Sequence, residues 1–244
     1  MSAASTTAGD EAHVPSSGSF VVKVFYVFAA LALASIGISL GGKWLGASIA
    51  AVGHSQDRTR YEILVGNNVL SVRGNMIRFE EARRDGDAER LDLYAKWPEF
   101  TGYADSDREA FNNRTPRKQI IFVAIEHRMM SRDMSGRLEP IYRKLIELPG
   151  SAGPSSLRRY DFTKESGYVN EVLIVGDRPG EAPFVARCLT GATAAESLAG
   201  CERDVHLGEQ LSLTYRFPEE LLPNWKALDA GVGALVSGLI RTAR

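Results

Sequence analysis

The chain has 244 residues, of which 44% are hydrophobic and 24% are charged, and its formal net charge is −1. A near-neutral balance argues against a general nucleic-acid-binding surface. The four histidines are scattered and there are only two cysteines, so the sequence predicts no metal site. Phosphate-binding glycine motifs are also missing, so we expect no cofactor.

The N-terminal region combines a polar tail with one long apolar run. Residues 1–19 are rich in Ser, Ala, Thr and Gly, and this composition predicts a disordered tail. The run Val24–Gly42 contains no charge and, at roughly 19 residues, is long enough to cross a ~30 Å hydrocarbon layer as a helix. The sequence therefore predicts a membrane anchor at 20–46. Its predicted anchor residues include Val24, Phe25, Phe28, Leu33, Gly37 and Gly41.

Two other readings of this run stay open. A cleaved signal peptide would use Ser48-Ile49-Ala50 as its small-x-small site, although the apolar run is longer than such peptides need. A buried core helix would normally carry a polar stripe, which this run lacks. Gly37 and Gly41 also form a small-xxx-small pair that would permit self-association.

The two cysteines predict a disulfide and, with it, a compartment. Cys188 and Cys201 are separated by the flexible stretch LTGATAAESLAG, and a bridge closing a loop of this size stabilises by ~3 kcal/mol in the chain-entropy model. Disulfides persist in oxidising compartments, so we expect residues 54–244 to form one extracytoplasmic domain. The alternative is two buried thiols in a cytosolic domain.

Alternating apolar and polar residues predict strands through this domain. The clearest are 91–97 and 211–217, in which every second residue is apolar. The segments 61–65 and 69–72 flank Gly66-Asn67-Asn68, which suits a hairpin turn. Further strands are expected at 120–125, 168–175, 184–189 and 205–207, and the second half is interpreted as an antiparallel meander.

Two helices complete a predicted α+β fold with a mainly antiparallel sheet. One is expected at 139–148, with Pro140 in its first turn. The other is a C-terminal amphipathic helix after Pro218, whose apolar stripe has spacings of three and four residues. Small residues occupy its opposite face, so this helix either covers one face of the sheet or also binds a partner. Its apolar stripe comprises Leu221, Trp225, Leu228, Val232, Leu235 and Leu239.

Catalytic residues remain unidentified from the sequence. His127 follows an apolar strand and is the one histidine that suits acid–base chemistry, although a strand-end role is the simpler reading. Asp161, Glu165 and Glu171 would form a carboxylate cluster if their strands pair as a hairpin. Arginine clusters at 83–84, 114–118 and 158–159 are interpreted mainly as solvated surface because acidic residues accompany the first of them.

Three segments carry a resemblance to a known class of proteins. NMIRF at 75–79, DLYAKWPEFTGY at 92–103 and RFPEELLPNW at 216–225 resemble single-span inner-membrane proteins of Gram-negative bacteria that carry a periplasmic domain. This resemblance implies an inner-membrane location with the C-terminal domain in the periplasm. It implies no activity and no functional residue.

Three function classes follow from the sequence. The first is a membrane-anchored binding or accessory module of the cell envelope with a protein partner. The second is an anchored enzyme that acts on an envelope polymer or lipid through His127 or the three acids. The third is a structural subunit that forms a homo-oligomer through its anchor or its C-terminal helix.

Overall fold

The computed structural model describes the backbone of residues 18–50 and 53–241, and the side chains of residues 22–38 and 53–241. Most of the predicted disordered tail, residues 1–17, lies outside this range. The chain divides into two compact units, Met1–Ala50 and Ala51–Arg244.

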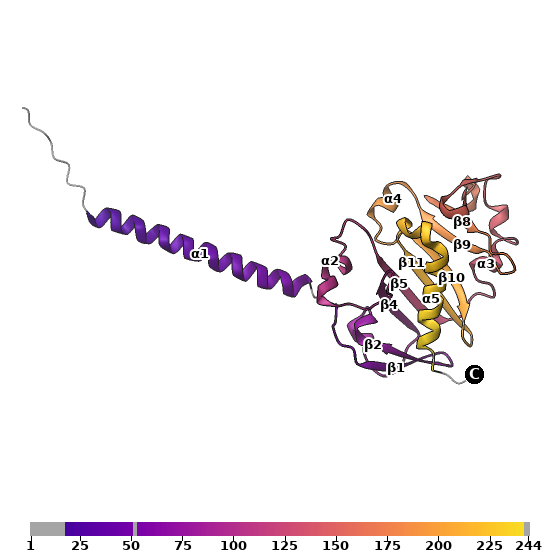
Figure 1. Ribbon diagram of the computed structural model, residues 1–244, viewed down its shortest axis with the longest axis horizontal. Coiled ribbons are helices and arrows are strands. Elements are labelled where there is room, and N and C mark those ends of the chain that lie inside the picture. The colour runs from indigo at the N-terminus through magenta and orange to yellow at the C-terminus, as the bar shows by residue number, and fades with distance from the viewer. Residues whose placement is uncertain (1–17, 51–52, 242–244) are drawn as a thin grey trace, which may run out of the picture. The chain divides into compact units, whose positions relative to one another are not determined.

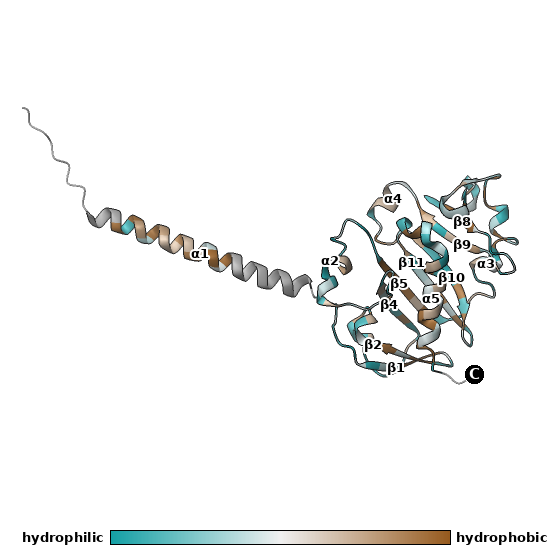
Figure 2. Cartoon of the chain, in the orientation of Figure 1, coloured by the Kyte–Doolittle hydropathy of each residue, from teal (hydrophilic) through white to brown (hydrophobic). Residues whose placement is uncertain are grey.

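The described part of the first unit is the helix α1 (Gly18–Ala50). Its described side chains are mostly apolar, as Figure 2 shows, and several are exposed, among them Phe25, Phe28 and Leu33. No helix within the described side chains is both long and apolar enough to cross a membrane.

The second unit is built around an eight-stranded sheet with the order β4-β5-β11-β10-β9-β8-β7-β6. Every neighbouring pair in it is antiparallel. Figure 1 shows helix α5 lying across this sheet. The strands are β4 (Arg90–Lys96), β5 (Ile120–His127), β6 (Ser151–Ala152), β7 (Leu157–Asp161), β8 (Glu171–Gly176), β9 (Phe184–Leu189), β10 (Cys201–Leu207) and β11 (Leu211–Phe217).

This arrangement confirms an α+β domain with a mainly antiparallel sheet and a C-terminal helix. Strands β7 to β11 are neighbours in chain order, which confirms the predicted meander. Within this meander the pair β9–β10 has a short register, which joins only Cys188 to Cys201 and Arg187 to Glu202; the edge pair β6–β7 also has two residue pairs.

A second, three-stranded sheet has the order β2-β1-β3, with β1 (Arg60–Val65), β2 (Asn68–Arg73) and β3 (Gly86–Asp87). The β1–β2 hairpin was predicted, and its register pairs Val65 with Asn68 around a two-residue turn. Gly66 has a φ of +58° there, which glycine adopts without steric cost. The separation of this hairpin from the large sheet, as part of a second sheet, was not predicted.

The main core lies between one face of the large sheet and a layer made of the small sheet and α5 (Trp225–Leu239). The 3₁₀ turn η7 (Glu219–Asn224) leads into α5, and Ile240 at the helix end pairs with Leu70 of β2. Five of the six stripe residues predicted for the C-terminal helix are buried in this core. The sixth, Leu235, is partly buried and packs against the core. These side chains are therefore not available as a partner-binding surface.

The other face of the large sheet, called here the outer face, is covered by described residues at its two ends. At one end, α3 (Met134–Arg137) and η4 (Tyr142–Lys144) pack on β7, β8 and β9. At the other end, the segment with η3 (Asp105–Asp107) and α2 (Arg108–Phe111) packs on β4 and β5. The outer face of β10 and β11 lies between these two small cores.

The predicted helix at 139–148 is wrong. Residues 145–147 instead pair with the chain that follows β7, where Ile146 forms a bridge with Phe162 and the Glu147 N–H donates to the Asp161 carbonyl at 2.9 Å. These pairings satisfy the backbone that a helix would otherwise satisfy internally. The remaining described elements are short 3₁₀ turns and one helix: η1 (Gly74–Met76), η2 (Glu80–Ala82), η5 (Pro154–Ser156), η6 (Lys164–Ser166) and α4 (Gly191–Glu196).

Candidate binding groove

A concavity of about 440 Å³ lies on the outer face of strands β4, β5, β11 and β10. We call it the basic groove. Its floor consists of outward residues of these strands, because alternate side chains in a strand point to opposite faces. The side chains used below are Arg78, Arg90, Asp92, Phe122, Leu198, Glu202, Thr214 and Arg216.

Arg78 lies between two aromatic rings at one side of the groove. Its guanidinium carbon is 5.0 Å from the ring centroids of both Phe79 and Phe122. Its backbone N–H donates to the Asp92 carbonyl at 2.9 Å, which fixes the segment beside the edge strand β4. Such stacking holds a cation in place while leaving its N–H donors to face a ligand.

Arg90 is already occupied by acidic neighbours. Its Nε and Nη2 each donate to Asp92 at 2.9 Å, and Nη1 lies 3.3 Å from Glu126. The hydrogen bonds that Arg90 donates to Asp92 raise the pKa of Arg90 above its ordinary value. Arg90 therefore acts as a fixed part of the groove floor and has few donors left for a ligand.

A row of alternating charges crosses four strands and ends in the groove. Arg187 on β9 lies 3.2 Å from Glu171 on β8 and 2.9 Å from Glu202 on β10. Glu202 also accepts from Arg216 Nε of β11 at 2.8 Å. Burial alone would lower the pKa of Arg187, but Glu171 and Glu202 outweigh it, so the pKa is raised.

Arg216 ends this row with free donors. Its side chain is 63% exposed, and Nε is its bonded nitrogen among the described contacts. The two Nη groups therefore face the groove and solvent. Together with Arg78, they provide the unoccupied cationic donors of the groove.

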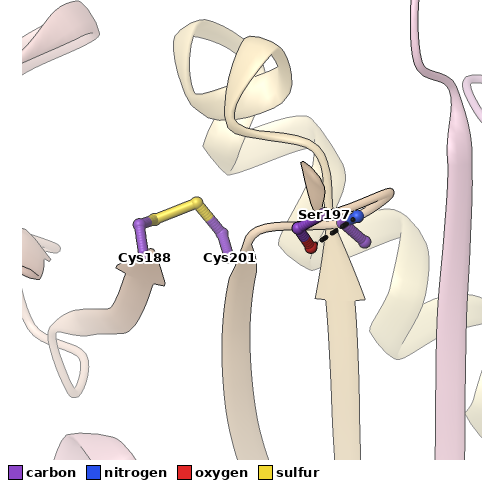
Figure 3. The surroundings of a disulfide bond; sticks show 4 residues. Cys188, Ser197 and Cys201 are labelled. Carbon is purple, nitrogen blue, oxygen red and sulfur yellow. Dashed lines mark hydrogen bonds between the residues drawn. A yellow bond between two sulfur atoms is a disulfide. The ribbon is translucent and has the colours of Figure 1, made fainter. Parts of the chain in front are cut away.

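The disulfide positions the wall of the groove. Cys188 and Cys201 are bonded, directly opposite in register, with Cα atoms 4.0 Å apart, which confirms the predicted bridge. Figure 3 shows the bridge at the ends of β9 and β10 with Ser197 on the loop between them. This loop contains α4 and supplies Leu198, which is 44% exposed at the groove margin.

Arg203, the residue of β10 that follows Glu202, points to the opposite face of the sheet, toward the core. Arg203 is 3% exposed; its Nε donates to Asp229 of α5 at 2.9 Å, and its Nη1 donates to the Val185 carbonyl and to Ser135 Oγ at 3.0 Å. The Arg203 side chain thus fills the gap where β9 and β10 have separated. Arg178 also forms an ion pair with Asp229.

The candidate acid–base residues of the sequence do not assemble. Strands β7 and β8 pair as expected, but Asp161 is opposite Val172 on the core face, so the adjacent Glu171 points to the outer face. Glu165 lies exposed in η6. The proposed carboxylate cluster is therefore wrong. His127 is exposed at the end of β5, beside a second concavity.

No group of His, Cys, Asp and Glu suited to a metal ion occurs in the described part of the chain. The groove residues Arg78, Phe122 and Arg216 were not singled out from the sequence. Arg216 belongs to the predicted polar side of strand 211–217, and such residues are ordinarily solvated. The arginine clusters noted from the sequence do not line this groove. Arg83 in the first of them, for example, donates to the backbone carbonyl of Ile77.

Comparison with known proteins gives no family. No protein-family description matches the chain, and no curated protein matches it. One solved structure, an immunity protein of the Stenotrophomonas maltophilia type IV secretion system, is 14% identical and has a TM-score of 0.50 over 78% of this chain and 96% of its own.

A second solved structure is the iron-regulated outer membrane lipoprotein FrpD of Neisseria meningitidis. It is 11% identical, with a TM-score of 0.43 over 77% of this chain and 94% of its own. At 14% identity, the similarity to the immunity protein concerns the fold alone.

Proposed function

We propose that this protein is a membrane-anchored binding or accessory module of the cell envelope, which binds a protein partner in the basic groove. The observation that carries the proposal is the groove itself, where Arg78 and Arg216 present unoccupied donors between two covered parts of an otherwise packed sheet. A stacked guanidinium without a carboxylate partner can bind an anionic group through its free N–H donors.

The anchor and location are parts of the same proposal. The uncharged run Val24–Gly42 lies within α1, and most of the exposed side chains described for this helix are apolar. An exposed apolar surface of this kind needs a membrane or a partner to cover it. The disulfide is consistent with an oxidising compartment, which in a single-span inner-membrane protein is the periplasm.

The fold similarity fits this proposal but does not carry it. A solved structure with the same fold is an immunity protein, yet a fold supports many unrelated functions. The enzyme alternative loses its candidate acids, because Asp161 and Glu171 point to opposite faces of the sheet. Binding in the groove is the function that the described geometry favours.

Site-specific photo-crosslinking in intact cells tests the proposal. A photo-reactive amino acid replaces Leu198 at the groove margin in the full-length protein, and a matched form carries it at Ala230, an exposed position on α5. We expect one reproducible protein adduct from position 198 and none from position 230. Adducts that are absent from position 198, or equal at both positions, would contradict binding in the groove.

A further inference from the structure

A second concavity adjoins the basic groove and has the opposite charge. It has a volume of about 790 Å³ and shares Arg90 with the basic groove. Its acidic side chains are Asp87, Glu89 and Glu126. We call it the acidic concavity. Arg90 bonds acids on both sides, so it marks the boundary between the two concavities.

Both concavities offer apolar contacts beside their charges. Met129 is 86% exposed and Leu64 is 37% exposed at the acidic concavity. In the basic groove, Phe122 forms part of the floor and Leu198 part of the margin. Methionine adapts to varied partners because its side chain is unbranched and polarisable. The surface therefore combines charge recognition with places for apolar side chains.

This mixed pattern selects the chemistry of the occupant. A uniform polyanion, such as a nucleic acid or an anionic lipid surface, would meet Asp92 and Glu202 within the groove and the acids of the neighbouring concavity. Like charges at short range oppose such binding. A polypeptide segment can instead vary its charge and polarity from residue to residue.

We propose that the two concavities together bind one segment of a partner protein that carries acidic, apolar and basic residues. An acidic side chain of the segment accepts hydrogen bonds from Arg78 and Arg216. A basic side chain faces Glu89 and its acidic neighbours, and apolar residues contact Phe122, Leu198 and Met129. This inference rests on the proposed binding function and specifies the partner's chemistry.

Selection from a phage-displayed library of random peptides tests this inference on the full-length protein in nonionic detergent. We expect enriched peptides to contain both an acidic and a basic residue with apolar residues nearby. The absence of enrichment, or enrichment of peptides with no acidic residue, would overturn the inference. This experiment does not depend on a cellular partner, so it can succeed or fail separately from the crosslinking.

Charge-reversal variants then test which concavity binds the acidic residue of the peptide and which binds the basic residue. A charge-assisted hydrogen bond contributes about 1.5–3 kcal/mol, so Arg78→Glu is expected to weaken a selected peptide by about tenfold or more. Replacing the acidic residue of that peptide by glutamine should lower its affinity for the unmodified protein. The same replacement should lower its affinity for Arg78→Glu by little, because the partner of the acidic residue is already lost. Glu89→Lys should show the equivalent coupling with the basic residue of the peptide.

Two controls distinguish the occupant from other anions. Arg114→Glu changes an exposed arginine outside both concavities and should leave peptide binding unchanged. Phosphatidylglycerol vesicles and polyglutamate should compete weakly. Strong competition by either probe, abolished by Arg78→Glu, would show that the groove binds anionic polymers or lipid and would overturn the inference.

Discussion

Asp229 shows how a single buried acid organises the centre of the domain. Its carboxylate accepts from Arg203 Nε at 2.9 Å and from the Tyr215 hydroxyl at 2.5 Å, and it forms an ion pair with Arg178. Burial alone would raise the pKa of Asp229, but these partners outweigh burial and the pKa is lowered. The acid therefore stays ionised and joins α5 to β10, β11 and the loop after β8.

Replacing Asp229 by asparagine should strongly destabilise the protein at neutral pH. The change leaves Arg203 and Arg178 without their acid, and breaking a buried ion pair costs about 3–5 kcal/mol. Because the folded pKa lies below the ordinary value of 3.8, this contribution is present above that value and is lost as the pH falls through the folded pKa.

Chemical unfolding at a series of pH values measures this effect. The difference between the unmodified protein and Asp229→Asn should be largest near neutral pH and should shrink under acid conditions. Asp177→Asn serves as a matched control because Asp177 is exposed. A difference that does not change with pH would contradict the assigned role of the Asp229 charge.

Two glycines of α5 give opposite predictions for the same substitution. A Cβ at Gly231 would lie 2.2 Å from Cε2 of Phe100, whereas a Cβ at Gly233 would meet nothing within 4 Å. Gly231→Ala should therefore destabilise by about 1–3 kcal/mol through overpacking. Gly233→Ala should stabilise by up to about 1 kcal/mol because alanine favours helix. Thermal unfolding of both variants checks the prediction, and equal shifts would disprove the Phe100 contact.

At the scale of elements, strands 91–97 and 211–217 were predicted well because the residues facing the main core in them are apolar and buried. The alternation in 91–97 and 211–217 directly reports that burial. The 139–148 helix failed because apolar residues in a short segment also suit extended pairing, here between Ile146 and Phe162. The groove was missed because Arg78 and Arg216 are far apart in sequence and meet only through strand order, which local patterns do not specify.

The disulfide is predicted to restrain the loop that carries α4. Replacing both cysteines by alanine should cost about 2–4 kcal/mol and should loosen the groove wall. Glu196 is the charged residue of this loop, so a glutamate-specific protease reports on its opening. Faster cleavage after Glu196 in the double variant is expected, together with weaker crosslinking at position 198. Unchanged cleavage would show that the wall is held by other contacts.

At the scale of the whole molecule, the proposal joins an apolar helix to a domain that presents a polar groove. The two units differ in chemistry, since α1 exposes apolar side chains while the second unit buries its own in one main core and two smaller ones. A tether of this kind raises the local concentration of a binding module near membrane-bound partners. Anchoring would therefore contribute to affinity without adding a contact.

Cell fractionation and thiol labelling test the anchored, extracytoplasmic arrangement. The full-length protein is expected in the membrane fraction after carbonate washing, and deletion of 24–42 in an exported form should release it. In unreduced, denatured samples from intact cells, Cys188 and Cys201 should resist alkylation. Full alkylation of both thiols would contradict an oxidising compartment, and release of the intact chain by carbonate would contradict the anchor.

The pairing of β9 with β10 joins the two halves of the large sheet through only two residue pairs. Besides these two residue pairs, the strands are linked by the disulfide, by the Arg187–Glu202 ion pair and by the hydrogen bond from Arg203 to the Val185 carbonyl. Reducing the disulfide should let the amides of β8 and β9 exchange with deuterium as one group, apart from those of β11 and β5. We expect the covalent bridge to couple the opening of these two groups of strands, so that the groove keeps its floor and its wall together.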